Sequence, residues 1–149
     1  MIIQIVPYQE DYHDKLMDIW YQAVCLTHTF LTEEDIKFYY EMLQNGALNQ
    51  VEIWLALNEN NEPSGFIGLD GKKIEMLFVH PQYHRTGVGS RLIHHAVKIK
   101  GIHIQLDVNE QNENAYTFYK QMGFVQIGRS ELDHSGRPFP LLHLILKSQ

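Results

Sequence analysis

The sequence predicts an α+β fold, a single domain over residues 1–149 in which helices flank a mixed central sheet. The length of 149 residues is that of one domain with a sizeable core. Apolar residues switch along the chain between strand-like runs and the three- and four-residue spacing of helices. A β-like run from Ile74 also leads through a glycine-bearing turn into a helical pattern that reaches Lys100. The expected order of elements is β-α-α-β-β-β-α-β-α-β-β.

The first half of the chain predicts a strand, two helices and an antiparallel meander. Pro7 should end the opening apolar run because proline cannot donate to a ladder. Thr32 and Asp35 have the spacing of a capping box, which predicts the start of the second helix. Asp70-Gly71 should close a tight hairpin. Strands are expected at residues 2–6, 51–57, 65–69 and 73–79, and helices at residues 10–24 and 32–43.

The second half predicts alternating helices and strands. A helix to Lys100 should connect the strand at 73–79 to a strand at 102–108 by a right-handed crossover. Gly123 is suited to the position after a helix that spans residues 112–122. The last two strands are expected at residues 124–130 and 141–146. The apolar strand Leu141 to Leu146 is a candidate for pairing across a homodimer.

Composition excludes several classes of partner. Lys and Arg number 12 against 18 Asp and Glu, and the resulting charge of −6 argues against nucleic acid. No apolar run is long enough for a membrane span, and the start lacks the pattern of a leader, so a cytoplasmic protein is expected. The single Cys25 excludes an internal disulfide. The nine histidines show no recognised zinc spacing, so no metal is expected.

The turn after the β-like run is a candidate anion site. Gly87 and Gly89 lie where the strand has ended and the helix is about to start, so backbone N–H groups can converge there without side chains in the way. It is not a Walker loop, because no Gly-Lys-Ser/Thr follows, and Leu92 stands where the dinucleotide fingerprint has its third glycine. By itself the turn favours an anion, with an unliganded glycine-rich connection as the alternative.

Two segments together carry a resemblance to a known family. The turn reads Pro81-x-x-His84-x-x-Gly87-x-Gly89-x-x-Leu92, and the segment 108–124 carries Asn112, Ala115, Tyr119 and Gly123-Phe124. They resemble the pyrophosphate loop and the second signature of the GNAT superfamily of acyl-CoA-dependent N-acetyltransferases, and are similar to its small bacterial members. The resemblance implies acetyl-CoA as cosubstrate and covers nearly the whole chain. His84 departs from the usual Arg or Gln, and Arg85 stands where Gly is common.

The resemblance also implies which residues contact acetyl-CoA. The family uses backbone N–H groups of the strand before the loop and of the loop itself. Arg85 is predicted to supply the charge that His84 does not. The predicted contacts are Leu77, Phe78, Val79, His84, Arg85, Thr86, Gly87, Val88, Gly89, Ser90, Asn112 and Tyr119.

Transfer of the acetyl group by direct attack in a ternary complex needs an oxyanion donor, a route for the amine proton and an acid for the thiolate. A backbone N–H within residues 77–79 matches the first need, and Tyr119 matches the family's general acid. Glu75 is the candidate base, with a water chain or a solvated glutamate as alternatives. Strand alternation places Glu75 on the face of Leu77 and Val79.

The acceptor site is predicted from the segments outside the two signatures. His28 and Phe30 follow the first helix, and Asp133 lies in the late polar loop, where a carboxylate can hold a cationic amine. A structural histidine and a solvated aspartate are the alternatives. The acceptor is expected to be a small-molecule amine or a protein amine.

Two other classes of function remain to be weighed. A non-catalytic acyl-CoA-binding or regulatory module would keep the loop and lose the chemistry, but Tyr119 and Asn112 favour catalysis. A nucleotide-binding oxidoreductase is disfavoured by the missing third glycine and by the antiparallel strands before the motif.

Overall fold

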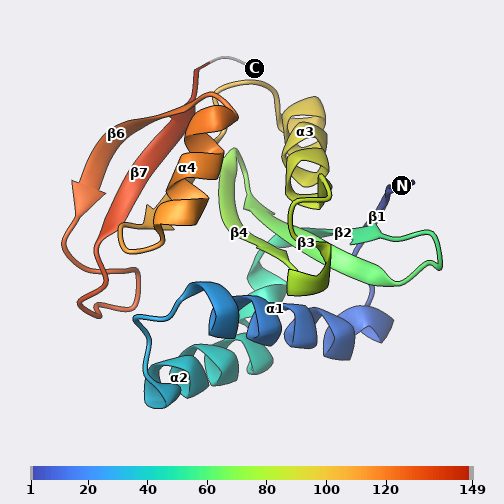
Figure 1. Cartoon of the computed structure of the whole chain (residues 1–149), viewed down its shortest axis with the longest axis horizontal. Helices are drawn as coiled ribbons and strands as arrows, with labels where there is room; N and C mark the ends of the chain where they lie inside the picture. Colours follow the sequence, from blue (N-terminus) through green and yellow to red (C-terminus); the bar gives the residue numbers. More distant parts are fainter. Residues whose placement is uncertain (1, 148–149) are drawn as a thin grey trace.

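The computed structural model describes residues 2–147, which form a seven-stranded mixed sheet with helices on both faces (Figure 1). The strand order is β1-β2-β3-β4-β5-β7-β6. The strands are β1 (Gln4–Pro7), β2 (Glu52–Leu57), β3 (Pro63–Asp70), β4 (Lys73–Val79), β5 (Gln105–Asn109), β6 (Phe124–Ser130) and β7 (Leu141–Leu146). The α-helices are α1 (His13–Thr27), α2 (Glu33–Gln44), α3 (Val88–Lys100) and α4 (Glu113–Gln121), and the 3-10 helices are η1 (Glu10–Tyr12), η2 (Ala47–Gln50) and η3 (Pro81–Tyr83).

The predicted order of strands and α-helices is confirmed. The capping box at the start of α2 is also confirmed, because Thr32 accepts from the Asp35 amide while the Asp35 carboxylate accepts from the Thr32 amide. The bounds of several elements differ from the prediction, most clearly those of α1 and β5. A 3-10 turn delays the start of α1 to His13 and the helix continues to Thr27, and β5 begins only at Gln105.

Two apolar cores lie on opposite faces of the sheet. Figure 1 shows α1 and α2 along one side of the sheet and α3 and α4 along the other. Leu16 and Trp20 of α1 pack against Phe66 of β3 in the first core. Leu92 of α3 belongs to the second core with Leu106 of β5. Helices at 3.6-residue periodicity thus bury one stripe each against a sheet that is apolar on both faces.

The two central strands β4 and β5 separate soon after they meet. Their parallel pairing covers only Lys73 with Gln105 and Ile74 with Leu106. Beyond Ile74, β4 remains paired with β3, while β5 remains paired with β7. The carboxyl halves of β4 and β5 therefore diverge in the middle of the sheet, which leaves backbone groups of both strands facing a gap rather than a ladder.

The last strand does not have the position that the dimer prediction needs. β7 lies between β5 and β6 and pairs with both along its length. The prediction that Leu141 to Leu146 could pair across a homodimer is therefore wrong, because both of its hydrogen-bonding edges are used within the chain. The edges of the sheet are β1 and β6. Among residues 2–147, no helix has the length and apolar character to cross a membrane.

Candidate active site

Glu75 occupies a β-bulge in β4. Ile74 pairs with Leu69 and Met76 pairs with Gly68, so Glu75 is the extra residue on its strand. Ile74 and Leu77 consequently pack in the same core, although a regular strand would put them on opposite faces. Glu75 instead lines a cavity on the α1–α2 face with Met76 and Phe78. The prediction that Glu75 shares the face of Leu77 and Val79 is therefore wrong.

The backbone of β4 beyond the bulge presents two N–H groups to the gap beside β5. The His80 amide donates to the Ser64 carbonyl at 2.9 Å. Because amide directions alternate along an antiparallel ladder, the Phe78 amide also points toward β3, and those of Leu77 and Val79 point away from it. The predicted backbone donor within residues 77–79 is thus narrowed to Leu77 and Val79, whose side chains pack in the α3–α4 core.

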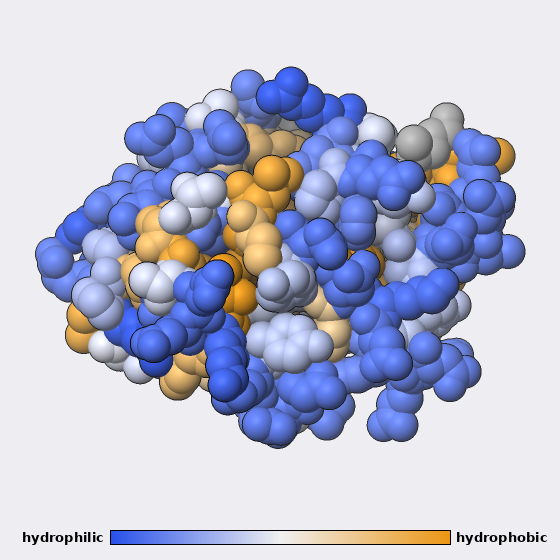
Figure 2. Space-filling view, turned by 60° about the horizontal axis from the view of Figure 1, so that its bottom comes forward, coloured by the Kyte–Doolittle hydropathy of each residue, from blue (hydrophilic) through white to orange (hydrophobic). Residues whose placement is uncertain are grey.

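A cavity of about 200 Å³ lies between the sheet and helices α1 and α2. Most of its walls are apolar or aromatic, and no lysine or arginine of residues 2–147 lines it. Figure 2, which turns the bottom of the Figure 1 view forward, shows apolar residues gathered in one part of this face among polar surroundings. The lining residues are Trp20, Val24, His28, Leu31, Tyr39, Met42, Leu43, Glu75, Met76, Phe78, Asn109, Asp133 and Phe139.

The two carboxylates of the cavity, Asp133 and Glu75, differ in the number of hydrogen bonds and ion pairs that they already make. The Oδ1 atom of Asp133 accepts from the amides of Ser135 and Arg137, each at 2.9 Å, and its Oδ2 accepts from the Tyr39 hydroxyl. Among residues 2–147, the one ion-pair partner of Glu75 is Lys73, with Nζ 3.8 Å from Oε1. Asp133 thus lines the cavity but organises its own loop, and Glu75 is the carboxylate with room for a further partner.

The loop that carries Asp133 is attached to α2. Arg137 donates to Asp35 Oδ1 at 2.8 Å, and its guanidinium lies 3.8 Å from the centre of the Phe38 ring. The pKa of the Asp35 carboxyl is lowered first by the hydrogen bond from the Thr32 amide and further by Arg137. Residues about a hundred positions apart in the chain therefore form one wall of the cavity.

His28 follows the last residue of α1 and lines the cavity as a neutral imidazole. Burial lowers its pKa to about 4. Its ring centre lies 5.4 Å from that of Phe30 and 6.4 Å from that of Phe78. Phe30 does not line the cavity itself, but it contacts both His28 and the lining residue Phe139, whose ring centre is 5.8 Å away. The structure therefore brings His28, Asp133 and Glu75 to one cavity. Phe30 packs against two of the lining residues without lining the cavity itself.

The glycine turn forms an uncapped N-terminus at α3. Gly87 has φ +93° and makes no side-chain capping bond, and the first turn of α3 contains no acidic residue. The first amides of α3 are therefore available to an anion. Arg85 has φ +63°, a left-handed conformation that favours glycine and so accounts for the glycine common at that position in the family pattern. Thr86 donates to the Tyr83 carbonyl, and Ser90 to the Met122 sulfur.

Two other predicted cofactor contacts have structural partners. His84 Nε2 donates to the Val79 carbonyl at 2.9 Å, which ties the loop back to the end of β4. Asn112 caps α4, because its side-chain oxygen accepts from the Ala115 amide at 3.3 Å. Val88 is buried in the core. Gly89 lies against Phe118, and a Cβ added at Gly89 would come within 3.4 Å of the Phe118 ring. Within residues 2–147, the side-chain amide nitrogen of Asn112 and the Nδ1 atom of His84 have no hydrogen-bond partner, so they remain for a ligand.

Tyr119 lies in the α3–α4 core with a side chain that is 8% exposed. Its ring packs against Phe118 and Phe124, with centres 5.5 and 5.7 Å away. Burial raises the pKa of its hydroxyl above the usual range, so the group stays protonated at neutral pH. Its hydroxyl makes no hydrogen bond within residues 2–147.

Several residues of the cavity were not predicted. Asn109 ends β5 beside the gap, and its Oδ1 is buried without a partner among the described residues. Alternation along β5 would have placed it on the same face as Asp107, but nothing in the sequence shows that this face meets Glu75. Tyr39 was not singled out in the sequence either, and together with Trp20 it serves both core and cavity.

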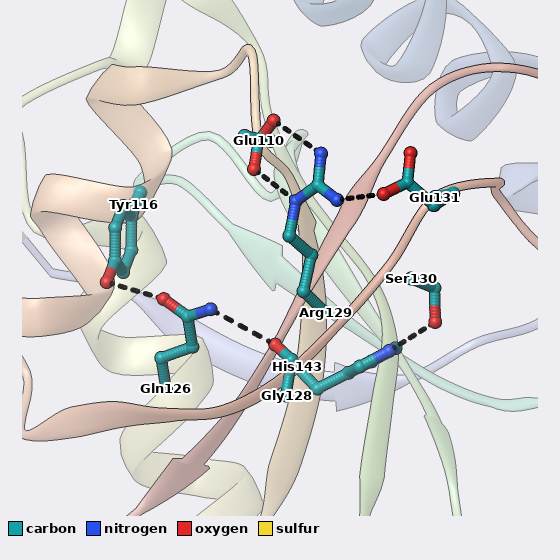
Figure 3. Close-up of polar contacts among 8 residues, drawn as sticks. All are labelled: Glu110, Tyr116, Gln126, Gly128, Arg129, Ser130, Glu131 and His143. Atoms are coloured by element: carbon teal, nitrogen blue, oxygen red, sulfur yellow. Dashed lines mark hydrogen bonds and ion pairs between the residues drawn. The ribbon is translucent and has the colours of Figure 1, made fainter.

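A polar network covers the sheet beside the cavity, on β5, β6 and β7. Asp107 accepts from Lys73 at 2.8 Å and contacts His143 Nδ1 at 2.6 Å, while His143 Nε2 lies 2.6 Å from Ser130 Oγ. Figure 3 shows the contact between Ser130 and His143 and, next to it, Arg129 held between Glu110 and Glu131. Within the described part of the chain, no three His, Cys, Asp or Glu residues are arranged to hold a metal ion.

The separated central strands, the uncapped helix after β4 and the adjoining cavity define an acetyltransferase of the GNAT class. The chain matches the family described as Acetyltransferase (GNAT) domain over residues 18–140, and it belongs to that family. The resemblance seen in the sequence, the fold and the assignment to the N-acetyltransferases are thereby confirmed.

Individual proteins agree with this assignment. The chain is 39% identical over 144 residues to Peptidyl-lysine N-acetyltransferase YjaB of Escherichia coli (strain K12), covering 97% of each. The solution structure of apo-form YjaB from Escherichia coli has a TM-score of 0.92 at 36% identity and covers 100% of both chains. The PaiA N-acetyltransferase of Thermoplasma acidophilum, solved in complex with coenzyme A, shares the fold with a TM-score of 0.74 at 21% identity, over 96% of this chain and 98% of that one.

Proposed function

We propose that this chain transfers the acetyl group of acetyl-CoA to the side-chain amine of lysine residues in polypeptides, by direct attack in a ternary complex. The observation that carries the proposal is the position of Glu75. The bulge places this weakly engaged carboxylate in an apolar cavity, two residues before Leu77, the first of the two residues whose amides face the gap between β4 and β5. The proteins YjaB and YiaC, whose names specify peptidyl-lysine, support lysine as the acceptor.

The residues present fit acetyl-CoA. The uncapped amides at the start of α3 suit the pyrophosphate, and Arg85 and the Asn112 amide lie in the segments next to it. Acetyl-CoA supplies the acetyl group as an activated thioester. The Leu77 and Val79 amides face the gap where the thioester carbonyl would lie, so they are the donors for the developing negative charge.

The cavity fits a lysine side chain. Its apolar walls suit the methylene stem of lysine, and Glu75 can receive the ammonium head. An ammonium has no lone pair, so Glu75 must accept a proton before the nitrogen can attack. Lys73 lies beside Glu75, with Nζ 3.8 Å from Oε1.

Tyr119 is the candidate donor to the leaving thiolate. A thiol has an ordinary pKa of about 8.5, below that of tyrosine, so proton transfer from a tyrosine to a thiolate is already unfavourable. The raised pKa of Tyr119 makes complete proton transfer more unfavourable still. The hydroxyl therefore acts by donating a hydrogen bond that stabilises the thiolate in a site with little water.

The proposal is tested with acetyl-CoA and a lysine-containing peptide. We expect free thiol to appear and mass spectrometry to locate one added acetyl group on the lysine. The matched control is the same peptide with its lysine acetylated in advance, which should release no thiol. Acetylation of free small amines but not of the peptide would refute the acceptor class.

Glu75→Gln keeps the shape of the side chain and removes its basicity. We expect kcat to fall by about 10²- to 10⁴-fold, the range for loss of a general base, with an unchanged KM for acetyl-CoA. Equal turnover by the variant and the wild type would remove Glu75 from the mechanism and favour a water chain.

A further inference from the structure

The end of α1 contains two hydrogen bonds that share one hydroxyl group. Thr27 Oγ1 lies 2.8 Å from the carbonyl oxygen of Ala23, one helical turn earlier, and 2.8 Å from Nδ1 of His28. The His28 amide donates to the Val24 carbonyl at 2.9 Å, which fixes the backbone of this turn. Thr27 is thus held between a helix carbonyl and the imidazole that lines the cavity.

The proton count at this hydroxyl determines the tautomer of His28. A carbonyl oxygen only accepts, so the single hydroxyl proton of Thr27 must lie toward Ala23. The short contact to His28 then requires Nδ1 to carry the proton that it donates to Thr27. The opposite arrangement would leave two oxygen atoms 2.8 Å apart with no proton between them. A neutral imidazole has one N–H, so Nε2 carries a lone pair.

The lone pair is available at the cavity. His28 lines the same cavity as Glu75, and its Nε2 makes no hydrogen bond within residues 2–147. Burial lowers the pKa of the imidazole to about 4, so Nε2 stays unprotonated at neutral pH and is a hydrogen-bond acceptor rather than a base. The rings of Phe30 and Phe78 restrict the position of the imidazole.

We propose that Thr27 is a positioning residue that holds His28 in the Nδ1–H tautomer, so that Nε2 accepts a hydrogen bond from the amino group of the acceptor. This inference rests on the function proposed above. Glu75 takes one proton from the ammonium and becomes a carboxylic acid, and His28 accepts a hydrogen bond from one of the two N–H groups that remain without removing its proton. That hydrogen bond restricts rotation about the terminal C–N bond of the neutral amine, so the lone pair can be held toward the gap beside β4.

The test compares Thr27→Val with Thr27→Ser. Valine has nearly the same shape as threonine but no hydroxyl, whereas serine retains the hydroxyl. We expect Thr27→Val to raise the KM for the lysine peptide about tenfold, the equivalent of one hydrogen bond, with an unchanged KM for acetyl-CoA. Thr27→Ser should restore the wild-type KM. Thermal melting checks that both variants are folded, and Thr27→Ala replaces valine if that variant does not fold.

The tautomer is measured directly by ¹⁵N NMR of the histidine side chains, with His28→Asn used to assign the signal. We expect the Nδ1–H form in the wild type and in Thr27→Ser, and a shift toward the Nε2–H form in Thr27→Val. An Nε2–H tautomer in the wild type overturns the proposal whatever the kinetics show. The expected tautomers with an unchanged peptide KM in Thr27→Val also overturn it.

Failure of the proposed function is distinguishable from failure of this inference. If the wild type acetylates no lysine peptide, the proposed function fails and the acceptor role of His28 fails with it. The effect of Thr27 on the tautomer is still decided by NMR, which needs no substrate.

Discussion

The buried neutral His28 predicts a loss of stability in mild acid. Its pKa is about 4 in the folded chain against an ordinary value of 6.5, so between these values the unfolded chain binds more protons. The free energy of unfolding therefore falls as the pH drops from 6.5 to 4, and the full stability is present above pH 6.5. A shift from 6.5 to about 4 corresponds to about 3 kcal/mol in total, of which about 2 kcal/mol is lost between about pH 8 and pH 5.

Urea unfolding followed by circular dichroism, across about pH 4.5 to 8, measures this effect. His28→Asn is the comparison variant because asparagine does not titrate in this range. Burial also lowers the pKa of His95, and Asp35 and Asp107 have lowered pKa values, but these groups are present in both proteins and their contributions cancel in the difference. The carboxylates moreover lose their contributions at lower pH, below their ordinary values near 4.

The expected result is a stability difference between the two proteins that changes by about 2 kcal/mol from about pH 8 to pH 5, with the wild type losing more in acid. A constant difference over this range would show that His28 titrates normally in the folded chain. The imidazole would then be solvated and would become protonated below about pH 6.5, and the assignment of Nε2 as an acceptor in an apolar cavity would lose its basis.

Substitutions at three further positions test the loop and the core. Arg85 has φ +63°, so Arg85→Gly should be more stable than Arg85→Ala by about 1 kcal/mol in urea unfolding. Both variants should raise the KM for acetyl-CoA if the guanidinium binds it. An unchanged KM in both variants would exclude that contact. A Cβ at Gly65 would lie 2.9 Å from Val88 Cγ1 and 3.0 Å from the Phe78 carbonyl oxygen. Gly65→Ala should therefore reduce the free energy of unfolding by about 1 to 3 kcal/mol and lower the melting temperature. An unchanged melting temperature would contradict that packing. Tyr119→Phe removes a hydroxyl that has no hydrogen-bond partner within residues 2–147, so the free energy of unfolding should change by less than about 1 kcal/mol. The kcat should fall, because the donor to the leaving thiolate is lost. Full turnover by the variant would remove that role from Tyr119.

The periodicity of the sequence was sufficient for the order of the elements, because each helix and strand has its own local pattern. The bulge at Glu75 was not predictable in this way. Residues 73–79 form a continuous strand-like run, and the shift of register appears only when Gly68 and Leu69 of β3 are set against it. The position of β7 between β5 and β6 likewise depends on pairing between distant segments.

In the candidate site, too, some features follow from adjacent residues of the sequence and others depend on contacts between distant segments. The glycine turn was predictable because its residues are adjacent in the sequence and Gly87 adopts a φ of +93°, which favours glycine. The engagement of Asp133 was not, because Tyr39 reaches it from a helix 94 positions earlier in the chain. His84 was predicted as a cofactor contact from its place in the motif, but its bond to Val79 depends on how the loop folds back on the strand.

The bulge and the separation of β4 from β5 are adjacent parts of one arrangement. The parallel ladder ends at Ile74, and the extra residue of β4 is Glu75, the next one along the chain. A bulge bends its strand and increases the local twist, so it directs β4 away from β5 at the point where pairing stops. The same change of register turns Glu75 toward the cavity while the amides of Leu77 and Val79 face the gap. One inserted residue therefore accounts both for the free backbone donors and for the position of the candidate base, on the two sides of the place where the acetyl group would be transferred.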